Sequence, residues 1–213
     1  MTVRILIIDD HEVAREGLAK LLRGPHIDVT STSSGGDDPL AKIDAEPVDA
    51  VLLDVRMPNS DGLSMLAKIH SAKPKLPVIM LSAHDNPTYI ARAVALGATD
   101  YLLKSDDKTK MTQAVTDAVE GRAASSDSSF KKVEQLMRKE TSPDQVPSKV
   151  PLTPREIQVM RHVGLGLSNK EIASSLSISV ETVKEHVQNI LRKLGANDRT
   201  DAAVRAVKMG LVN

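Results

Sequence analysis

Five residues with chemically useful side chains each stand at or just after the end of a short apolar run. They are Asp9, Asp10, Asp54, Ser82 and Lys104. Three carboxylates that share a small site repel one another strongly, so they need a cation. Oxygen ligands on a rim open to water suit Mg²⁺, or Mn²⁺ in its place. If these chain positions meet, they predict a cation site made of acids.

One carboxylate of such a site remains free to act as a nucleophile, as in enzymes that form aspartyl phosphates. Asp54 is the best candidate, because it ends a central apolar run and precedes the turn Val55–Pro58. Lys104 would hold phosphoryl oxygens as a point charge, and Ser82 would donate a hydrogen bond to them. The predicted chemistry is phosphoryl transfer to Asp54.

An alternation of strands and helices would bring these positions together. Most of the runs are continuously apolar, as expected for strands buried on both faces of a parallel sheet. The predicted strands are Val3–Ile8, Ile27–Thr32, Ala50–Leu53, Val78–Leu81 and Tyr101–Leu103. The predicted helices are His11–Leu22, one starting at Pro39 after an N-cap at Asp38, Leu63–His70, Tyr89–Leu96 and Met111–Val119. We therefore expect a doubly wound α/β domain with a five-stranded parallel sheet, and a ligand site at the carboxyl ends of its strands.

The chain divides by composition into three parts. Residues 1–121 form the α/β domain, residues 122–150 are rich in Ser, Ala and Pro, and residues 151–213 are helical again. The middle part has linker composition, although apolar residues from Phe130 to Met137 recur at helical spacing and predict a short helix there.

The last part predicts four helices. Thr153–Glu156 and Ser168–Glu171 have the pattern of capping boxes, Ser179 and Asp198 can cap the third and fourth helices, and Gly195 follows the third. The second helix, Asn169–Leu176, is joined to the third by the two residues Ser177–Ile178. This spacing predicts a helix-turn-helix.

The third helix, Ser179–Leu194, is amphipathic. Its apolar stripe runs from Val180 to Leu194, while Lys184 and Gln188 lie four residues apart on the opposite face. In a major groove, lysine can bind guanine and glutamine can bind adenine. Glu185 on the same face can accept from cytosine but repels phosphate.

The α/β part, roughly residues 3–121, resembles the receiver domain of two-component response regulators. The matching strings are Ile-Ile-Asp9-Asp10-His11, Leu-Leu-Asp54-Val-Arg-Met-Pro58, Leu81-Ser82-Ala83 and Tyr101-Leu-Leu-Lys104. Ser105 departs from the proline common after that lysine, and Asp100 from a frequent glycine.

This resemblance implies that Asp54 takes a phosphoryl group from a phosphohistidine on a sensor histidine kinase. It implies that Mg²⁺ is bound by Asp10, Asp54 and the backbone carbonyl of Arg56, with Asp9 assisting. Lys104 would bridge to the phosphoryl group. Ser82 and Tyr101 would form a switch pair, in which the hydroxyl moves onto the phosphoryl oxygen and the ring follows inward.

Residues 151–212 resemble the LuxR-type helix-turn-helix domain of NarL/FixJ regulators. The matching strings are Leu152-Thr-Pro-Arg-Glu156, Gly166-Leu-Ser-Asn-Lys-Glu-Ile-Ala173, Ser179-Val-Glu-Thr-Val-Lys184-Glu-His-Val187 and Leu191-Arg-Lys-Leu-Gly-Ala196. The resemblance implies a recognition helix whose base-facing residues are Lys184, Glu185 and Gln188. The expected phosphate contacts are Thr182, Asn169, Lys170, Arg192 and Lys193. The helix Asp198–Met209 would mediate dimerisation through Ala202, Ala203, Ala206 and Val207.

Charge and composition agree with this division of labour. Residues 1–120 carry 13 Lys and Arg against 18 Asp and Glu, whereas residues 151–213 carry 9 against 6. The basic end is the nucleic-acid candidate. The chain has no cysteine, which excludes disulfides and cysteine metal sites, and its three aromatic residues are too few for a base-stacking surface. No apolar run reaches the length of a membrane span and no signal peptide is evident, so we expect a cytoplasmic protein without membrane contact.

We expect a transcriptional regulator: phosphorylation of Asp54 would control homodimerisation and binding to double-stranded promoter DNA. An aspartyl phosphohydrolase is an alternative. Such an enzyme would need a second carboxylate, acting as acid or base, two residues after the nucleophile, and Arg56 occupies that position. A second alternative is a constitutive DNA binder whose receiver only dimerises. At single positions, Asp10 could instead cap the first helix, His11 would be a solvated residue of that helix, and His84 could border the site.

Overall fold

The computed structural model describes residues 2–36, 38–57, 60–138 and 152–209. Pro58, the linker from residue 139 to 150, residue 151 and residues 210–213 lie outside the described residues. The chain forms two compact units. The first contains residues 1–86 and 96–131, and the second contains residues 87–95 and 132–213.

The first unit is built on a five-stranded parallel sheet. Its strands are β1 (Val3–Ile8), β2 (Ile27–Ser33), β3 (Ala50–Asp54), β6 (Val78–Ser82) and β7 (Asp100–Leu103), in the order β2-β1-β3-β6-β7. Every residue of β3 and β6 is buried, which explains their continuously apolar sequences. The predicted α/β fold is confirmed, and β1 and β3 are neighbours whose ends reach the same edge of the sheet.

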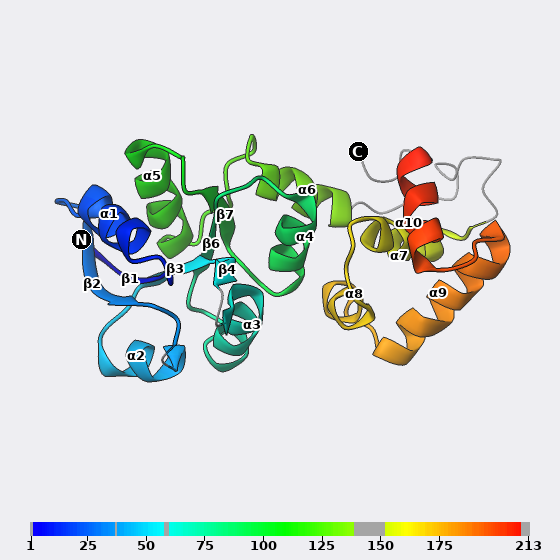
Figure 1. Ribbon diagram of the computed structural model, residues 1–213, viewed down its shortest axis with the longest axis horizontal. Coiled ribbons are helices and arrows are strands. Elements are labelled where there is room, and N and C mark those ends of the chain that lie inside the picture. Colours follow the sequence, from blue (N-terminus) through cyan, green and yellow to red (C-terminus); the bar gives the residue numbers. More distant parts are fainter. Residues whose placement is uncertain (1, 37, 58–59, 139–151, 210–213) are drawn as a thin grey trace. The chain divides into compact units, whose positions relative to one another are not determined.

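Helices cover both faces of this sheet, as Figure 1 shows. α1 (Glu12–Leu22) and α5 (Lys108–Val119) lie on one face, where Leu18, Leu22, Met111 and Val115 join a core with alternate residues of the strands. α2 (Pro39–Ala45) and α3 (Gly62–Ala72) lie on the other face. The alternation of side chains along each strand supplies apolar residues to both layers.

The helix starts show which polar residues are used locally. α2 begins as predicted, with Asp38 as N-cap and Pro39 in its first turn. The N-cap of α1 is His11, whose Nδ1 accepts a hydrogen bond from the backbone N–H of Ala14 at 3.3 Å. The alternative that Asp10 caps this helix is therefore wrong, and the Asp10 carboxylate is left for the rim of the sheet.

A two-stranded hairpin after β3 was not expected from the sequence. β4 (Arg56–Met57) pairs antiparallel with β5 (Ser60–Asp61), and Asp61 then caps α3 through a bond from Leu63 N–H to its Oδ1. Two-residue strands carry too short a pattern to be seen in the sequence. The hairpin fixes how the chain leaves Asp54.

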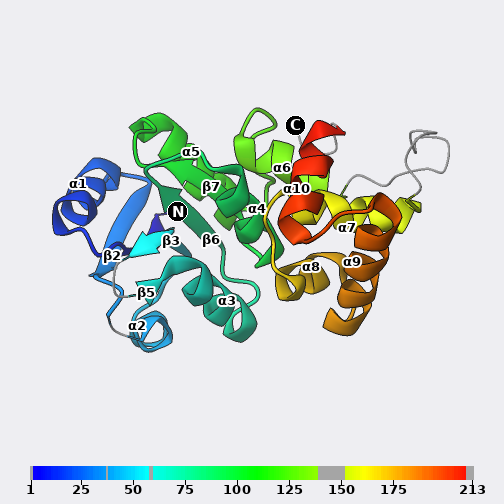
Figure 2. The same ribbon diagram turned by 45° about the vertical axis from the view of Figure 1, so that its right-hand side comes forward.

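Among its described residues the second unit contains helices and no strand, and it is seen from a second direction in Figure 2. It contains α4 (Pro87–Ala95), the end of α6 (Ser129–Arg138), α7 (Pro154–Gly164), α8 (Asn169–Leu176), α9 (Val180–Leu194) and α10 (Arg199–Lys208). Its core gathers buried residues of all these helices, such as Ala91, Met137, Met160, Val183 and Ala206. The predicted linker helix is confirmed as α6.

The caps predicted for this unit are confirmed. Thr153 and Ser168 form complete capping boxes with Glu156 and Glu171, and Ser179 and Asp198 cap α9 and α10. Gly195 ends α9 in the left-handed conformation with φ 60°. Ser177 adopts the same conformation in the turn before α9, with φ 52°. Within the described ranges, no helix combines the length and apolar character needed to cross a bilayer.

Candidate functional site: an acidic rim and an exposed helix

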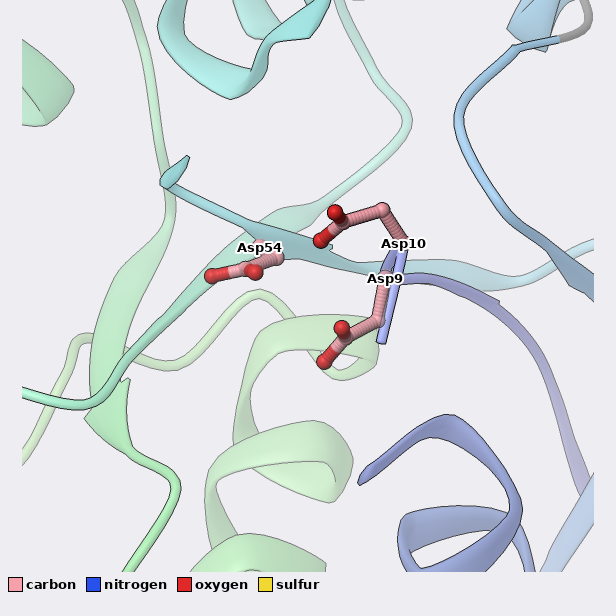
Figure 3. Close-up of side chains that lie close together, drawn as sticks. All are labelled: Asp9, Asp10 and Asp54. Atoms are coloured by element: carbon pink, nitrogen blue, oxygen red, sulfur yellow. The ribbon is translucent and has the colours of Figure 1, made fainter. Parts of the chain in front are cut away.

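Three carboxylates meet at the carboxyl edge of the sheet, as Figure 3 shows. Asp9 and Asp10 follow β1 and Asp54 ends β3, and one ligand atom from each lies within 4.8 Å of the others. Asp9 is 0% and Asp54 5% exposed, while Asp10 is half-buried. The parallel pairing of β1 with β3 brings together residues that are more than forty positions apart in sequence.

Lys104 joins this cluster from the end of β7. Its Nζ lies 2.6 Å from Asp9 Oδ2 and 2.9 Å from Asp54 Oδ2. The lysine is placed by its own backbone, because Lys104 N–H donates to the carbonyl of Ser82 at 2.7 Å. Burial alone would lower the pKa of Lys104, but its hydrogen bonds to Asp9 and Asp54 outweigh burial and raise it. The ammonium therefore stays charged and offsets part of the acidic charge.

Burial raises the pKa of Asp54, and the hydrogen bond from Lys104 opposes that rise only in part. The nearby Asp9 raises the pKa further. A carboxylate held in this way is poorly solvated, which favours its reaction as a nucleophile with an electrophile.

The backbone around Asp54 is held by contacts that sequence analysis missed. Val55 N–H donates to Leu81 O at 2.9 Å, and Gly62 N–H donates to Val55 O at 3.3 Å. A Cβ atom on Gly62 would lie 1.9 Å from the Asp54 carbonyl oxygen, so only glycine permits this approach. The only feature of the sequence that could have indicated this close approach is the glycine that follows Asp61 at the start of a helix.

Ser82 and Tyr101 share one acceptor. Ser82 Oγ donates to the backbone carbonyl of His84 at 3.0 Å, and Tyr101 OH donates to the same carbonyl at 3.2 Å. His84 N–H in turn donates to Ser82 Oγ at 3.1 Å. His84 thus enters the site through its backbone, which no side-chain pattern could reveal. The two predicted switch residues are coupled through this carbonyl.

The acidic rim has the chemistry of a Mg²⁺ site. Oxygens around one Mg²⁺ lie about 2.1 Å from the ion and so at most about 4.2 Å from one another. The limit of 4.8 Å among the atoms of Asp9, Asp10 and Asp54 therefore needs only small side-chain rotations. The donors are all oxygens, as Mg²⁺ prefers. The residues present fit the ion.

The second candidate surface is the outer face of α9. Lys184, Glu185 and Gln188 are all exposed, as predicted for base-facing residues. Lys184 Nζ lies 2.8 Å from Glu181 Oε1, one turn before it. Val183 and Ile190 are buried beneath this face, but Val180 is 36% exposed rather than part of the buried stripe. Val180 is the first residue of α9.

The predicted phosphate-contacting residues are in different situations. Lys170 and Arg192 are exposed, and Thr182 Oγ1 lies 2.8 Å from Ser179 Oγ at the N-cap. Asn169 Oδ1 accepts a hydrogen bond from Arg199 at 2.8 Å. Lys193 Nζ lies 2.7 Å from Glu156 Oε2, inside the capping box of α7.

The predicted dimer face of α10 is not a single surface. Ala202 and Ala206 are 1% and 0% exposed because they lie in the core of their own unit, so they are not available to a partner. Val207 is 50% exposed and Ala203 is half-buried, while Val204, which was not predicted, is 46% exposed. Alanines at helical spacing fit a domain core as well as an interface, so the sequence could not separate the two.

Comparison with known proteins agrees with both halves of the molecule. Residues 5–116 match the family model of the response regulator receiver domain. Residues 150–206 match that of bacterial regulatory proteins of the luxR family.

Relatives share this arrangement over their full length. The transcriptional regulatory protein LnrK of Bacillus subtilis (strain 168) is 37% identical over 98% of both chains. The response regulator protein VraR of Staphylococcus epidermidis is 31% identical over 100% of both. Among solved structures, the response regulator ChrA of a heme-sensing two-component system has a TM-score of 0.54 and 31% identity, covering 99% of both chains. The chain therefore belongs to the response regulators of the NarL/FixJ family, and its function is phosphorylation-dependent regulation of transcription.

Proposed function

We propose that Asp54 is the residue that accepts the phosphoryl group, that a sensor histidine kinase supplies this group, and that the modification controls dimerisation and DNA binding. The observation that carries this proposal is the placement of Asp54. It is a buried carboxylate at the carboxyl edge of the sheet, 2.9 Å from the ammonium of Lys104 and next to Asp9 and Asp10. The other carboxylates of the rim are less suitable as nucleophiles. Asp9 is wholly buried, and the half-buried Asp10 lies at the margin of the rim.

The transfer itself is a displacement at phosphorus. An oxygen of the Asp54 carboxylate forms a bond to phosphorus while the bond from phosphorus to the imidazole nitrogen of the donor breaks. That nitrogen keeps the electron pair. The Lys104 ammonium moves only a short way from Asp54 Oδ2 during the transfer, because its long side chain can bind a phosphoryl oxygen and Asp9 at the same time.

Asp9, Asp10, Asp54 and the backbone carbonyl of Arg56 are the groups that we propose to hold Mg²⁺ (or Mn²⁺). The ion, when bound, neutralises negative charge on the rim and on the phosphoryl oxygens. The residues of the chain keep the acids in place for it: His11 N–H donates to Asp9 Oδ1 at 2.9 Å, and Arg15 donates to the Asp9 carbonyl at 2.8 Å.

The signal leaves the site through Ser82 and Tyr101. We propose that the Ser82 hydroxyl gives up the His84 carbonyl and donates to a phosphoryl oxygen on Asp54. Tyr101, which donates to the same carbonyl, then loses the arrangement that holds its ring in place. This explains how a charge added at β3 can change the backbone that follows β6.

On the DNA side, double-stranded promoter DNA is the proposed ligand. Lys184, Glu185 and Gln188 would contact bases in the major groove, and Thr182, Asn169, Lys170, Arg192 and Lys193 would contact phosphates. Phosphorylated chains would bind as homodimers, with the exposed Val204 and Val207 of α10 in place of the buried alanines. Two half-sites related by a two-fold axis would then be expected in the promoter.

The test is phosphate labelling with an acyl phosphate or a phosphorylated kinase. We expect slow, stoichiometric labelling of the wild type, none of Asp54→Ala, and normal labelling of the control Asp28→Ala, which removes an exposed carboxylate of β2. Steady release of phosphate with many turnovers would indicate a phosphohydrolase instead. Absence of labelling under all conditions, with full DNA binding, would indicate a constitutive DNA binder.

A second measurement connects the two halves. Gel-shift assays on genomic fragments should show tighter binding by the wild type when a phosphodonor is present, and no such gain for Asp54→Ala. Equal binding of both proteins with and without the donor would contradict control by Asp54.

A further inference from the structure

A cavity of about 350 Å³ lies in the first unit, between β7, α5 and the turn of residues 125–128 that follows α5. Small-molecule sites have volumes of about 300–1,000 Å³ and combine apolar walls with a few polar groups. None of the lining residues belongs to the acidic rim. Among them are Asp100 and Leu102 of β7, Lys110, Ala114 and Asp117 of α5, and Asp127 of the turn. We call this cavity the Asp100 pocket.

Asp100 is a buried acid with one unused oxygen. It is 5% exposed, and its Oδ1 accepts a hydrogen bond from Tyr101 N–H at 2.8 Å. Among the described residues no donor reaches the other oxygen, Oδ2. Oδ2 is not one of the fully enclosed atoms that lack a partner, so it reaches open space, which is the pocket. Burial of an incompletely paired carboxylate is destabilising, and a cation in the pocket would supply the missing partner.

The charges of the lining favour a cation over an anion. Lys110 and Asp117 already have partners of opposite charge outside the lining, at 2.7 Å and 2.6 Å respectively. Asp127 is exposed and forms no ion pair or hydrogen bond with a described residue. The charges left over in the pocket are therefore both negative: Asp100, which is buried, and Asp127, which stands where the pocket opens to solvent.

A metal ion fits this pocket poorly. In the described part of the chain, the acidic rim is the only group of three acids whose ligand atoms lie close enough to hold one ion, so the acids of the Asp100 pocket do not form such a group. Leu102 and Ala114 add apolar surface to the lining. Apolar surface suits an alkyl chain, whereas a divalent ion needs several oxygen ligands around it.

We propose that the Asp100 pocket binds a short linear diamine, a molecule with an ammonium group at each end of an alkyl chain. One ammonium donates to Asp100 Oδ2, and the alkyl chain packs on Leu102 and Ala114. The second ammonium lies beside Asp127. Two acids that do not share one ion favour a ligand with two separate charges over a ligand with one. This site does not depend on phosphotransfer to Asp54.

Calorimetric titration of the full-length protein with putrescine, a four-carbon diamine, tests the proposal. Excess Mg²⁺ is present, so that the diamine does not collect at the acidic rim. We expect saturable binding that Asp100→Asn weakens by roughly tenfold or more, because a charge-assisted hydrogen bond is lost at a buried site. The control Asp28→Asn removes an exposed acid of β2 and should bind like the wild type. Thermal unfolding shows whether each variant is folded.

Butylamine has the same alkyl chain with a single ammonium and separates the roles of the two acids. Asp127→Asn should weaken putrescine binding by a factor of a few, because that ion pair is exposed, and should leave butylamine binding unchanged. Asp100→Asn should weaken the binding of both ligands. If Asp127→Asn changed both affinities equally, the assignment of a diamine would be wrong.

The pH dependence gives a readout that general attraction to acidic surface does not. Burial raises the pKa of Asp100 to about 6, and the charged groups that face it are Lys110, Asp106 and Asp117 of its own unit, with Asp127 in the same lining. An ammonium pairs with the ionised carboxylate, so butylamine affinity should fall by about tenfold from pH 7 to pH 5. In Asp100→Asn it should change little over this range.

Three results would overturn the proposal. One is the absence of saturable putrescine binding by the wild type. Another is equal binding by the wild type and a folded Asp100→Asn variant, which would show general electrostatic attraction only. The third is a fall in butylamine affinity of the same size in both proteins between pH 7 and pH 5.

Discussion

The two functional surfaces of this response regulator are built in opposite ways. In the receiver unit two carboxylates of the site are buried, Asp9 at 0% and Asp54 at 5% exposure, and the charged groups stand at the ends of three strands. In the DNA-binding unit the groups that we propose to contact DNA, Lys184, Glu185 and Gln188, are exposed and come from one helix. The buried carboxylates of that unit, Glu156 and Glu171, belong to helix caps instead.

This difference follows from what each surface has to bind. A phosphoryl group is small, so the receiver must place a few groups at exact distances around it, and burial keeps them there. Promoter DNA is large, and a rigid helix presents all its contacts at once. The receiver site should therefore be sensitive to backbone changes, whereas the recognition face should be sensitive to single side chains.

The largest effect on stability is expected at Gly62, because its backbone lies against the backbone of Asp54. Gly62→Ala would place a Cβ against the Asp54 carbonyl, so we expect a loss of about 3 kcal/mol in the free energy of unfolding. Phosphoryl uptake should fall with it, because the chain at Asp54 must move. Chemical denaturation and phosphate labelling measure the two effects.

Gly17→Ala is the matched control, since it adds the same methyl group in open space on α1. It should raise stability by about 0.5–1 kcal/mol at low protein concentration, because alanine is the better helix former. Equal stability changes at the two glycines would contradict the positioning role of Gly62.

Asp100 tests the cost of a buried acid in the receiver. It is 5% exposed, and burial raises its pKa to about 6 although its Oδ1 accepts from Tyr101 N–H at 2.8 Å. An acid with a raised pKa destabilises the folded state progressively as the pH rises from about 4 to about 6, and its full cost is present above pH 6. Asp100→Asn should therefore add up to about 3 kcal/mol of stability at pH 7.

That gain should shrink as the pH falls from 6 and disappear below 4, where the acid is protonated in both states. Urea unfolding at pH 7 and pH 4 measures it, with the exposed Asp28→Asn as control. A gain that is the same at both pH values would show that ionisation is not its cause.

Lys184→Ala addresses the recognition face. The variant should lose about 1–3 kcal/mol of specific DNA binding if Lys184 contacts a base, while nonspecific binding changes little. Its ion pair with Glu181 is exposed, so opening that pair costs little. Competition assays with specific and random DNA measure the difference, and Lys108→Ala on the receiver serves as control. A uniform loss on all sequences would make Lys184 a phosphate contact.

Glu156 is the counterpart of Asp100 in the DNA-binding unit. Burial would raise the pKa of Glu156, but hydrogen bonds from Lys193 and Thr153 outweigh burial and lower it. An acid with a lowered pKa stabilises the folded state above pH 4.5, and this contribution is lost in more acidic solution. Glu156→Gln should therefore cost about 1.5 kcal/mol at pH 7, opposite in sign to Asp100→Asn. Destabilisation that persists unchanged at pH 3 would contradict this origin.

The smallest effect is expected in the helix-turn-helix turn. Ser177 adopts φ 52°, a conformation that costs about 1 kcal/mol for a residue with a side chain. Ser177→Gly should raise the thermal stability slightly, by up to about 1 kcal/mol, and leave DNA binding unchanged. Ser174→Gly, inside α8, should lower stability by a similar amount.

Sequence reasoning reached the strands, the helices and the acidic rim because local patterns carry them. Continuous apolar runs identified β1, β3 and β6, and capping residues such as Asp38, Thr153 and Ser168 identified helix starts within one or two positions. Prediction from the sequence failed where the local pattern was compatible with two different structures. The His11 cap and the burial of Ala202 and Ala206 are examples, since their neighbours in sequence do not decide which face is covered.

The amino-acid sequence by itself determined which residues stand at strand ends and which share a helix face, because these depend on periods of two and 3.6 residues. Only the tertiary structure decided that Gly62 lies against Asp54, that Ser82 and Tyr101 meet at the His84 carbonyl, and that Lys193 belongs to the cap of α7. These contacts join residues distant in the chain or use backbone atoms, and neither leaves a periodic trace in the sequence.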